Sequence, residues 1–145
     1  MGLISKAQVE TVDTARAVQL STSDLDELQA LYRLSYPGNS FDSRMLETGC
    51  YYGIRQGKEL VSVAGIHVCS PTYRVAAIGN VTTHPAYRGQ GLATIVCAKL
   101  CQSLLQTIDY IGLNVKADNI SAIRSYERLG FEYIATYDEC ALERK

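Results

Sequence analysis

Two segments of the 145-residue chain carry residues whose types and spacing suit chemistry on a phosphorylated ligand. The first is the glycine-rich turn 88–94, which follows the apolar, β-branched stretch 75–83 and precedes an amphipathic stretch. The first turn of a helix presents unpaired N–H groups and the positive end of the helix dipole. Because Gly89 and Gly91 allow close approach of the backbone, the turn predicts a pyrophosphate site to which Arg88 adds a positive charge.

Three phosphate-binding patterns compete at this turn. A P-loop needs Lys followed by Ser or Thr after its last glycine, and that sequence does not occur. A dinucleotide fingerprint needs a third glycine, where Thr94 stands. The third pattern, R-x-x-G-x-A, fits at Arg88, Gly91 and Ala93. An ordinary glycine turn in front of a core helix remains the alternative that needs no ligand.

The second segment, 113–131, contains the pattern N-x-x-A-x-x-x-Y-x-x-x-G-F. Asn119 predicts the N-cap of a short helix, on which Ala122 and Tyr126 share a face because they lie four residues apart. Taken alone, this segment is better explained by a half-buried aromatic residue in a packed helix than by a catalytic group.

The elements that must position these segments follow a mixed order of strands and helices. Strands are expected at 17–20, 51–54, 60–69, 75–83, 110–115 and 132–142, and helices from Ser23 to before Pro37, from Leu92, and from Asn119 through Leu129. A phase change in the apolar alternation beside Gly65 predicts a bulge. Residues 1–16 have weak periodicity and are expected to form a loose N-terminal segment.

Together the two segments resemble the GNAT N-acetyltransferase superfamily. H-P-x-Y-R-G-x-G-L-A is similar to its acyl-CoA pyrophosphate motif, and the second pattern is similar to the motif that follows it. The resemblance implies a single α/β (α+β) domain over 17–145, in which helices flank a central mixed, mostly antiparallel sheet. It also implies a splayed strand pair that forms the acyl-CoA slot, with acetyl-CoA as co-substrate, an amine as acceptor and no metal.

The resemblance further implies roles for individual residues. The backbone of Val81, Thr82 and Thr83 would pair with the pantetheine arm and the acetyl carbonyl, and Asn119 would contact the cofactor. Tyr126 would face the sulfur and stabilise the leaving thiolate. The pyrophosphate would be bound near Arg88 through the turn that comprises Gly89, Gln90, Gly91, Leu92, Ala93 and Thr94.

Acetyl transfer from a thioester to an amine sets limits on these roles. A phenol with a pKa of about 10 can donate to a thiolate, but full transfer to a thiolate whose acid has a pKa of about 8.5 is uphill by roughly 2 kcal/mol. We therefore expect hydrogen-bond stabilisation from Tyr126 rather than complete proton transfer. The oxyanion of the intermediate also needs a donor, which a backbone N–H near Thr82 or Thr83 would supply.

The general base is left open by the sequence. A lysine-type amine has a pKa of about 10.4 and must lose a proton before it attacks. Asn114 stands where the similar ribosomal-protein alanine acetyltransferases have a Glu, and the stretch 76–83 contains no carboxylate. The candidates are His67, Glu139 and a water chain. A non-catalytic acyl-CoA-binding or sensor module is therefore the alternative function, and a nucleotide-binding α/β domain is the third.

Composition excludes several other classes. The chain has 14 basic and 15 acidic residues, a net charge of −1, and no basic run, which disfavours nucleic acid and anionic membranes as partners. No apolar run reaches the roughly 18 residues of a membrane span, and no signal peptide is visible. Five cysteines without a C-x-x-C pair indicate reduced thiols in a cytoplasmic protein rather than a metal site.

Two further expectations concern the acceptor and the assembly. Ten of the twelve aromatic residues are Tyr, and five of them lie in the half of the chain that would form the acceptor site: Tyr32, Tyr36, Tyr51, Tyr52 and Tyr73. Few residues follow Phe131 compared with the final two strands that the family usually has. A homodimer in which another chain supplies an edge is therefore a hypothesis.

Overall fold

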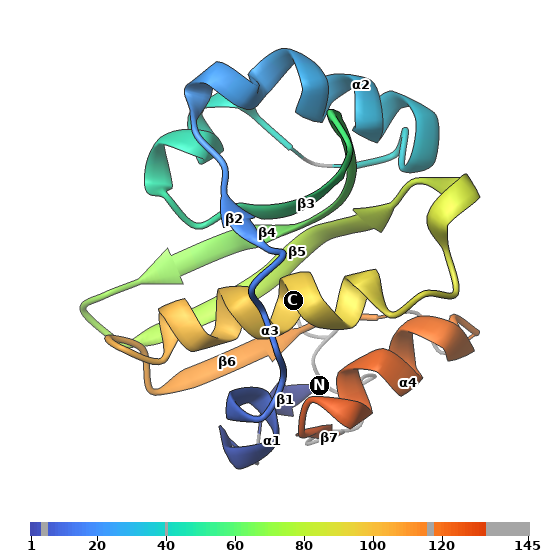
Figure 1. Cartoon of the computed structure of the whole chain (residues 1–145). Coiled ribbons are helices and arrows are strands. Elements are labelled where there is room, and N and C mark those ends of the chain that lie inside the picture. Colours follow the sequence, from blue (N-terminus) through green and yellow to red (C-terminus); the bar gives the residue numbers. More distant parts are fainter. Residues whose placement is uncertain (4–5, 40, 116–117, 133–145) are drawn as a thin grey trace.

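The strands pair into one mixed sheet of seven strands, in the order β2-β3-β4-β5-β6-β1-β7 (Figure 1). The computed structural model describes residues 1–3, 6–39, 41–115 and 118–132. The strands are β1 (Gly2–Leu3), β2 (Val18–Gln19), β3 (Tyr52–Gln56), β4 (Glu59–Ser70), β5 (Val75–Thr83), β6 (Tyr110–Leu113) and β7 (Phe131–Glu132). Neighbouring strands are antiparallel except β5 and β6, which run parallel. The mixed, mostly antiparallel sheet that the resemblance implies is confirmed.

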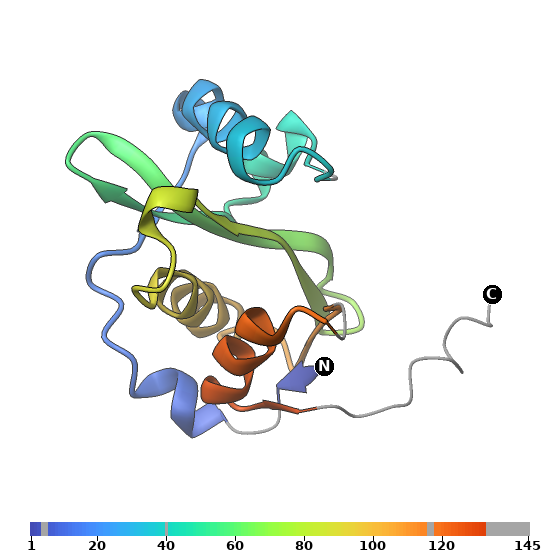
Figure 2. The same ribbon diagram turned by 90° about the vertical axis from the view of Figure 1, so that its right-hand side faces the viewer.

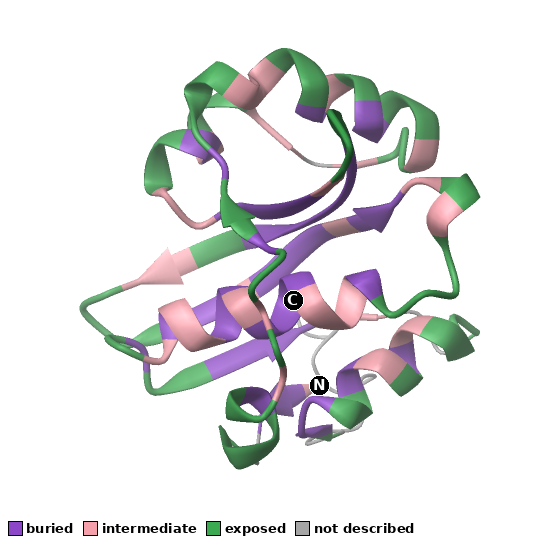
Figure 3. Cartoon of the chain, in the orientation of Figure 1, coloured by how far each residue is buried: buried purple, intermediate pink, exposed green. Residues whose placement is uncertain are grey.

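Helices cover both faces of this sheet. They are α1 (Lys6–Glu10), α2 (Leu25–Ser35), α3 (Leu92–Leu104) and α4 (Ile120–Arg128), with 3₁₀ turns η1 (Thr22–Asp24), η2 (Ser43–Thr48) and η3 (Pro85–Tyr87). Figure 2 shows α2 above the sheet and α3 and α4 below it. In α3 the apolar spacing of Leu92, Val96, Leu100 and Leu104 buries one face against the strands, as the sequence predicts (Figure 3).

Several predicted bounds are confirmed and others shift. The strand over 75–83 has the predicted limits, and α3 begins at the predicted residue, Leu92. The predicted cap at Ser23 is wrong, because a 3₁₀ turn capped by Ser21 precedes α2. The strand predicted over 110–115 ends at Leu113. The last strand begins at Phe131, and the rest of its predicted range, 133–142, lies outside the described residues.

The N-terminal segment differs from the loose terminus that its weak periodicity suggests. β1 pairs with both β6 and β7, so it lies inside the sheet, and Leu113 accepts a hydrogen bond from the N-terminal amine of Met1 at 2.6 Å. Val9 of α1 is 0% exposed, and Gln102 of α3 donates to the Val9 carbonyl at 3.0 Å. A two-residue strand and a one-turn helix give too little periodicity to be seen in a sequence. The described residues of this segment therefore pack with the sheet and with α3, and we propose that the segment belongs to the same domain.

We expect Val9→Ala to lower the free energy of unfolding by about 1–3 kcal/mol, because the change removes buried methyl groups and leaves a cavity. Val18→Ala is the matched control, since Val18 is 47% exposed, and surface changes of this kind are usually within about 0.5 kcal/mol. Urea unfolding of the two variants measures the difference. Equal midpoints would show that the N-terminal segment does not contribute to the stability of the domain.

Two bulges interrupt the pairing of β4 with β5, and they lie close together. Between the pairs Val63↔Thr82 and Gly65↔Gly79, β5 has two intervening residues where β4 has one, so β5 is bulged there. Between Ile66↔Ile78 and the next pair, β4 has one extra residue, His67. The irregularity predicted beside Gly65 is present, but the extra residue there belongs to β5, and the bulge of β4 itself lies two residues further on, at His67. The second bulge restores the original register. Bulges often re-aim backbone and side chains next to active sites.

A buried polar network holds the bulge in β5. Asn80 has a φ of +56°, in the left-handed region where Asn is among the few residues that fit readily. Its carbonyl accepts a 2.6 Å hydrogen bond from the hydroxyl of Tyr32 on α2. Its amide donates to the Tyr51 hydroxyl at 3.1 Å, and that hydroxyl donates to the Ile66 carbonyl at 3.1 Å. The network fixes the direction in which β5 continues beyond the bulge.

Candidate active site

The glycine-rich turn leaves the end of β5 through η3 and leads directly into α3. His84 caps η3, because its Nδ1 accepts a 3.0 Å hydrogen bond from the Ala86 amide. The other ring nitrogen, Nε2, lies 3.6 Å from a carboxylate oxygen of Glu59 on β4. His84 therefore fixes the start of the turn, a role that the Pro after it already suggests in the sequence.

The N-terminus of α3 is open to a ligand. Gly89 and Gly91 have φ values of +81° and +79°, which favour glycine, and a Cβ added at either would meet no atom within 4 Å. Gly91 is the N-cap, and no side chain caps the helix. The N–H groups of the first turn therefore have no partner within the helix, and they face a space that no side chain fills. This is the geometry of an anion-binding site.

One side chain in this first turn lacks a partner. Within the described part of the chain, Thr94 Oγ1 is the one side-chain oxygen or nitrogen atom that is itself fully buried and makes no hydrogen bond. A buried polar group left without a partner costs roughly 1–3 kcal/mol. A phosphate oxygen reached after a rotation about χ1 of Thr94 would remove that cost, so the residues present fit a pyrophosphate.

Arg88 is held by the protein itself in this structure. Its Nε donates to the Thr83 carbonyl at 2.9 Å, and its Nη2 donates to the Ser35 carbonyl at 3.4 Å. The side chain thus ties the turn to the end of β5 and to the last residue of α2. The sequence predicts a charge beside the anion but gives no sign of these two backbone contacts.

The pairing between β5 and β6 stops halfway along β5, and the unpaired edge of β5 beyond that point is called here the opening between β5 and β6. The parallel pairing ends at Ile78↔Leu113, and β5 continues to Thr83 without β6 beside it (Figure 1). The His84 amide donates to Val61 of β4 at 2.7 Å, so alternation of the backbone turns the groups of Thr83 toward the open edge and those of Thr82 toward β4. An unpaired edge of this kind can accept an extended ligand as an additional strand.

The second segment forms α4 on the α3 side of the sheet. Asn119 caps the helix, because its side-chain oxygen accepts a 3.3 Å hydrogen bond from the Ala122 amide. Gly130 has a φ of +100°, and Phe131 is buried against the ring of Tyr126 with centroids 5.9 Å apart. The predicted cap at Asn119 is confirmed, and a left-handed glycine followed by a buried aromatic residue ends the helix.

Tyr126 is 9% exposed, and its hydroxyl makes no hydrogen bond to any residue that the structure describes. Burial raises the pKa of Tyr126, and the nearby Cys97, Cys101 and Tyr36 raise it further. The phenol of Tyr126 keeps its proton throughout the neutral range.

The family of the chain follows from comparison with known proteins. A model described as the acetyltransferase (GNAT) family matches residues 16–131. The chain belongs to this family. A crystal structure described as a putative GNAT acetyltransferase from Novosphingobium aromaticivorans superposes with a TM-score of 0.77 and 33% identity, covering 90% of this chain and 58% of that one. The recognition of a GNAT from its two motifs is thus confirmed.

A sequence relative and a second solved structure are also similar to this chain. An uncharacterized protein of Mycobacterium leprae is 33% identical over 109 residues, which are 68% of this chain and 28% of that protein. The diaminobutyrate acetyltransferase of Paenibacillus lautus, in complex with L-2,4-diaminobutyric acid and coenzyme A, has a TM-score of 0.64 at 16% identity, covering 77% of this chain and 71% of that one. This GNAT therefore spans less than two-thirds of the two relatives that are 33% identical to it.

Several of the tyrosines that the sequence suggests as lining residues of the acceptor site have structural roles in the GNAT fold instead. Tyr32 and Tyr51 hold the β5 bulge, and the Tyr52 hydroxyl joins β3 to Ser103 of α3 at 2.9 Å. Tyr36 and Tyr73 are exposed. Three of the five tyrosines are therefore packing residues with hydrogen-bond partners, which their positions in the sequence could not reveal.

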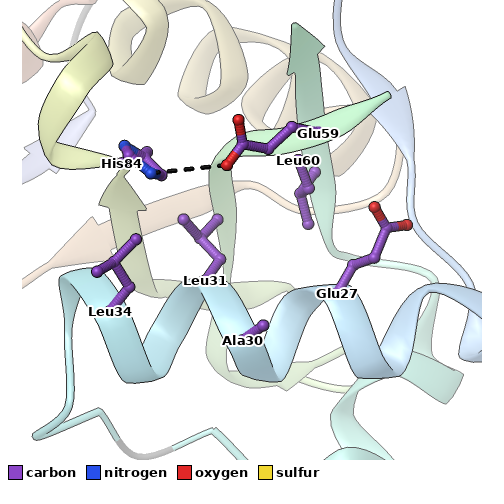
Figure 4. Close-up of a pocket in the computed structure, with 7 residues that line it drawn as sticks. All are labelled: Glu27, Ala30, Leu31, Leu34, Glu59, Leu60 and His84. Carbon is purple, nitrogen blue, oxygen red and sulfur yellow. Dashed lines mark ion pairs between the residues drawn. The ribbon is translucent and has the colours of Figure 1, made fainter. Parts of the chain in front are cut away.

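A pocket visible on the surface of this GNAT lies away from the opening between β5 and β6. Figure 4 shows Glu27, Leu31 and Leu34 of α2 facing Glu59 and His84, beside the start of β4. None of the residues predicted to bind the cofactor lines it. The described residues contain no cluster of three or more His, Cys, Asp or Glu suited to a metal and no helix long and apolar enough to cross a membrane.

Proposed function

We propose that the chain is an N-acetyltransferase that transfers the acetyl group of acetyl-CoA to a primary amine of a small molecule or protein, by direct attack in a ternary complex. The observation that carries the proposal is the open N-terminus of α3, whose glycines, free N–H groups and unpartnered Thr94 hydroxyl fit a pyrophosphate. Two features support it further: the strand opening beside it and the buried phenol of Tyr126.

Each element of the site has a role in this proposal. The turn Gly89–Thr94 binds the pyrophosphate through its backbone. The open edge of β5 at Val81 and Thr83 pairs with the pantetheine arm and supplies an N–H to the thioester oxygen, while Thr82 faces β4 and steadies the strand through Ser35, whose hydroxyl accepts its hydrogen bond at 3.0 Å. Splaying of β5 from β6 would form the slot.

The remaining residues complete the proposed site. Asn119 uses its side-chain oxygen to cap α4, so its amide N–H₂ is the group left for the cofactor. Arg88 would exchange its contact with the Thr83 carbonyl for a phosphate oxygen, a stronger charge-assisted bond. Tyr126 donates a hydrogen bond to the departing thiolate. No metal ion takes part in the proposed reaction.

Release of free thiol from acetyl-CoA tests the proposal. The full chain is assayed with a panel of primary amines: a lysine peptide, a peptide with N-terminal alanine, putrescine and L-2,4-diaminobutyric acid. Thiol release that depends on one of these amines, with the acetylated product seen by mass spectrometry, is the expected result. Tight acetyl-CoA binding without turnover would favour the sensor module, for which the Asn at position 114 is the specific argument. Competition by ATP or NAD would favour a nucleotide-binding domain.

We expect Thr94→Val to weaken acetyl-CoA binding about tenfold or more, because a hydrogen bond to a charged group contributes about 1.5–3 kcal/mol. We expect the free protein to keep its stability, since the hydroxyl has no partner among the described residues. Calorimetric titration with coenzyme A and thermal unfolding measure the two effects. Thr107→Val, in the exposed turn that follows α3, is the control. Unchanged affinity in Thr94→Val would remove this side chain from the site.

Two properties of the whole protein belong to the same proposal. Cys50, Cys69, Cys97 and Cys101 are free thiols, and burial raises the pKa of Cys97 to about 12, which keeps it inert. Free thiols are typical of a reducing compartment, so we propose a cytoplasmic location.

A homodimer remains a hypothesis, and a monomeric mass measured by light scattering would contradict it.

A further inference from the structure

Among the described residues, His67 is the histidine that lies over the point where β5 and β6 stop pairing. The following observations define its position. It is the extra residue of the bulge in β4. It is exposed, as is the next residue, Val68. A Cβ added to Gly79 of β5 would overlap the imidazole of His67, so the ring lies directly over that glycine.

Gly79 marks the point at which β5 and β6 separate. The last parallel pair is Ile78↔Leu113, and Gly79 is the next residue along β5. The imidazole therefore lies over the vertex of the opening. Any side chain at position 79 would push the ring away, so the glycine is the reason that a group from β4 can reach the vertex.

The face on which the ring lies is set by its neighbours. Gly65 is paired with Gly79, so the two share a face, and a Cβ on Gly65 would overlap the ring of Tyr51. Tyr51 packs against Phe41, which packs against Tyr32 of α2. The imidazole is thus on the α2 face, whereas α4, the helix that carries Tyr126, lies on the α3 face (Figure 2).

We propose that His67 is the general base of the acetyl transfer, and the proposal rests on the function proposed above. With the thioester in the opening, an acceptor approaching from the α2 face meets the imidazole, while the sulfur departs toward Tyr126. His67, which accepts a proton, and Tyr126, which donates a hydrogen bond, then lie on opposite faces of the sheet. It also supplies from β4 a base that β5 and Asn114 of this chain do not provide.

The step balances in protons and bonds. The acceptor ammonium gives one proton to a ring nitrogen of His67, directly or through one water, and the neutral nitrogen attacks the carbonyl carbon. A C–N bond forms, the C–S bond breaks, and the sulfur leaves as a thiolate that accepts a hydrogen bond from Tyr126. The new amide loses its second proton to solvent, and the thiolate and His67 return to their resting protonation states by exchange with water.

The test compares His67→Ala with Val68→Ala, which alters the neighbouring exposed residue of the same bulge. With the amine that the wild-type protein acetylates fastest, we expect His67→Ala to lose about 100-fold or more in kcat, a usual effect of removing a general base. The KM for acetyl-CoA stays within about twofold. Added imidazole restores part of the rate in His67→Ala but not in Val68→Ala. Gly79→Ala, which displaces the ring, lowers kcat with His67 still present.

The outcomes separate this inference from the function on which it rests. A His67→Ala variant that keeps kcat within about threefold of an active wild-type protein would overturn the role of His67 and leave the acetyltransferase intact. Loss of acetyl-CoA binding in the variant would show a structural role and overturn it equally. Absence of turnover in the wild-type protein with every amine would contradict the proposed function and, with it, the base.

Discussion

Replacing Tyr126 by Phe lowers kcat about 10- to 100-fold and leaves the KM for acetyl-CoA within about twofold, because the lost hydrogen bond is made to a charge that develops only as the thiolate leaves. Among the residues that the structure describes, the hydroxyl has no hydrogen-bond partner, so the change to Phe breaks no hydrogen bond between them. The Phe ring keeps the edge contact with Phe131. Steady-state kinetics with a saturating amine measure the change.

The raised pKa of Tyr126 restricts this residue to donating a hydrogen bond rather than transferring its proton. Burial is the first cause of the shift, and it disfavours the phenolate. A full proton transfer to the thiolate is therefore more costly than the roughly 2 kcal/mol expected for an ordinary phenol. The neutral phenol remains a donor across the neutral and mildly alkaline range. We thus expect no loss of rate between about pH 8 and 10 that is due to Tyr126.

Tyr52→Phe is the matched control for this prediction. The Tyr52 hydroxyl joins β3 to α3 at 2.9 Å from Ser103, away from the opening, so its removal costs about 1 kcal/mol of stability and leaves kcat unchanged. The two variants thus show opposite patterns in kinetics and in unfolding. A Tyr126→Phe variant with full turnover, or one that loses stability instead of rate, would remove Tyr126 from the chemistry.

The elements that sequence predicts well are those with long periodic patterns. The β-branched and apolar stretch of β5 predicts a strand with the limits seen in the structure, and the four-residue apolar spacing after Leu92 predicts the start and the buried face of α3. β1 and α1 escape prediction because their stability comes from tertiary contacts: β1 fits between β6 and β7, and Val9 packs inside the core. Such segments are fixed by neighbours that lie far away in sequence.

The candidate active site also combines local features, which the sequence reveals, with long-range contacts, which it does not. The glycine turn and the Asn119 cap are local, and their chemistry can be inferred from adjacent residues. The left-handed Asn80 depends on hydroxyls from Tyr32 and Tyr51, which lie 48 and 29 residues earlier in the chain. The approach of His67 to Gly79 depends on a register shift between two strands. Contacts of this kind exist only after the sheet has paired, so no spacing rule reveals them.

Gly91→Ala and Gly57→Ala are expected to destabilise the protein by the same amount and to differ sharply in ligand binding. The two glycines have φ values of +79° and +64°, and a Cβ at either would meet no atom within 4 Å. Each change therefore costs about 1–2 kcal/mol for placing Ala in the left-handed region. Gly57 lies in the turn between β3 and β4, whereas Gly91 caps α3.

The difference in binding isolates the phosphate-binding role of the turn. At Gly91 the new methyl group occupies the space in front of the free N–H groups of α3, so we expect the dissociation constant for coenzyme A to rise at least about tenfold, the equivalent of one lost hydrogen bond to a charged group. In Gly57→Ala we expect the dissociation constant for coenzyme A to stay unchanged. Titration with coenzyme A and with 3′-dephospho-coenzyme A, alongside thermal unfolding, measures both effects. Equal affinity in the two variants would mean that the open space at Gly91 is not where the pyrophosphate lies, and the glycine turn would then serve only to start the helix.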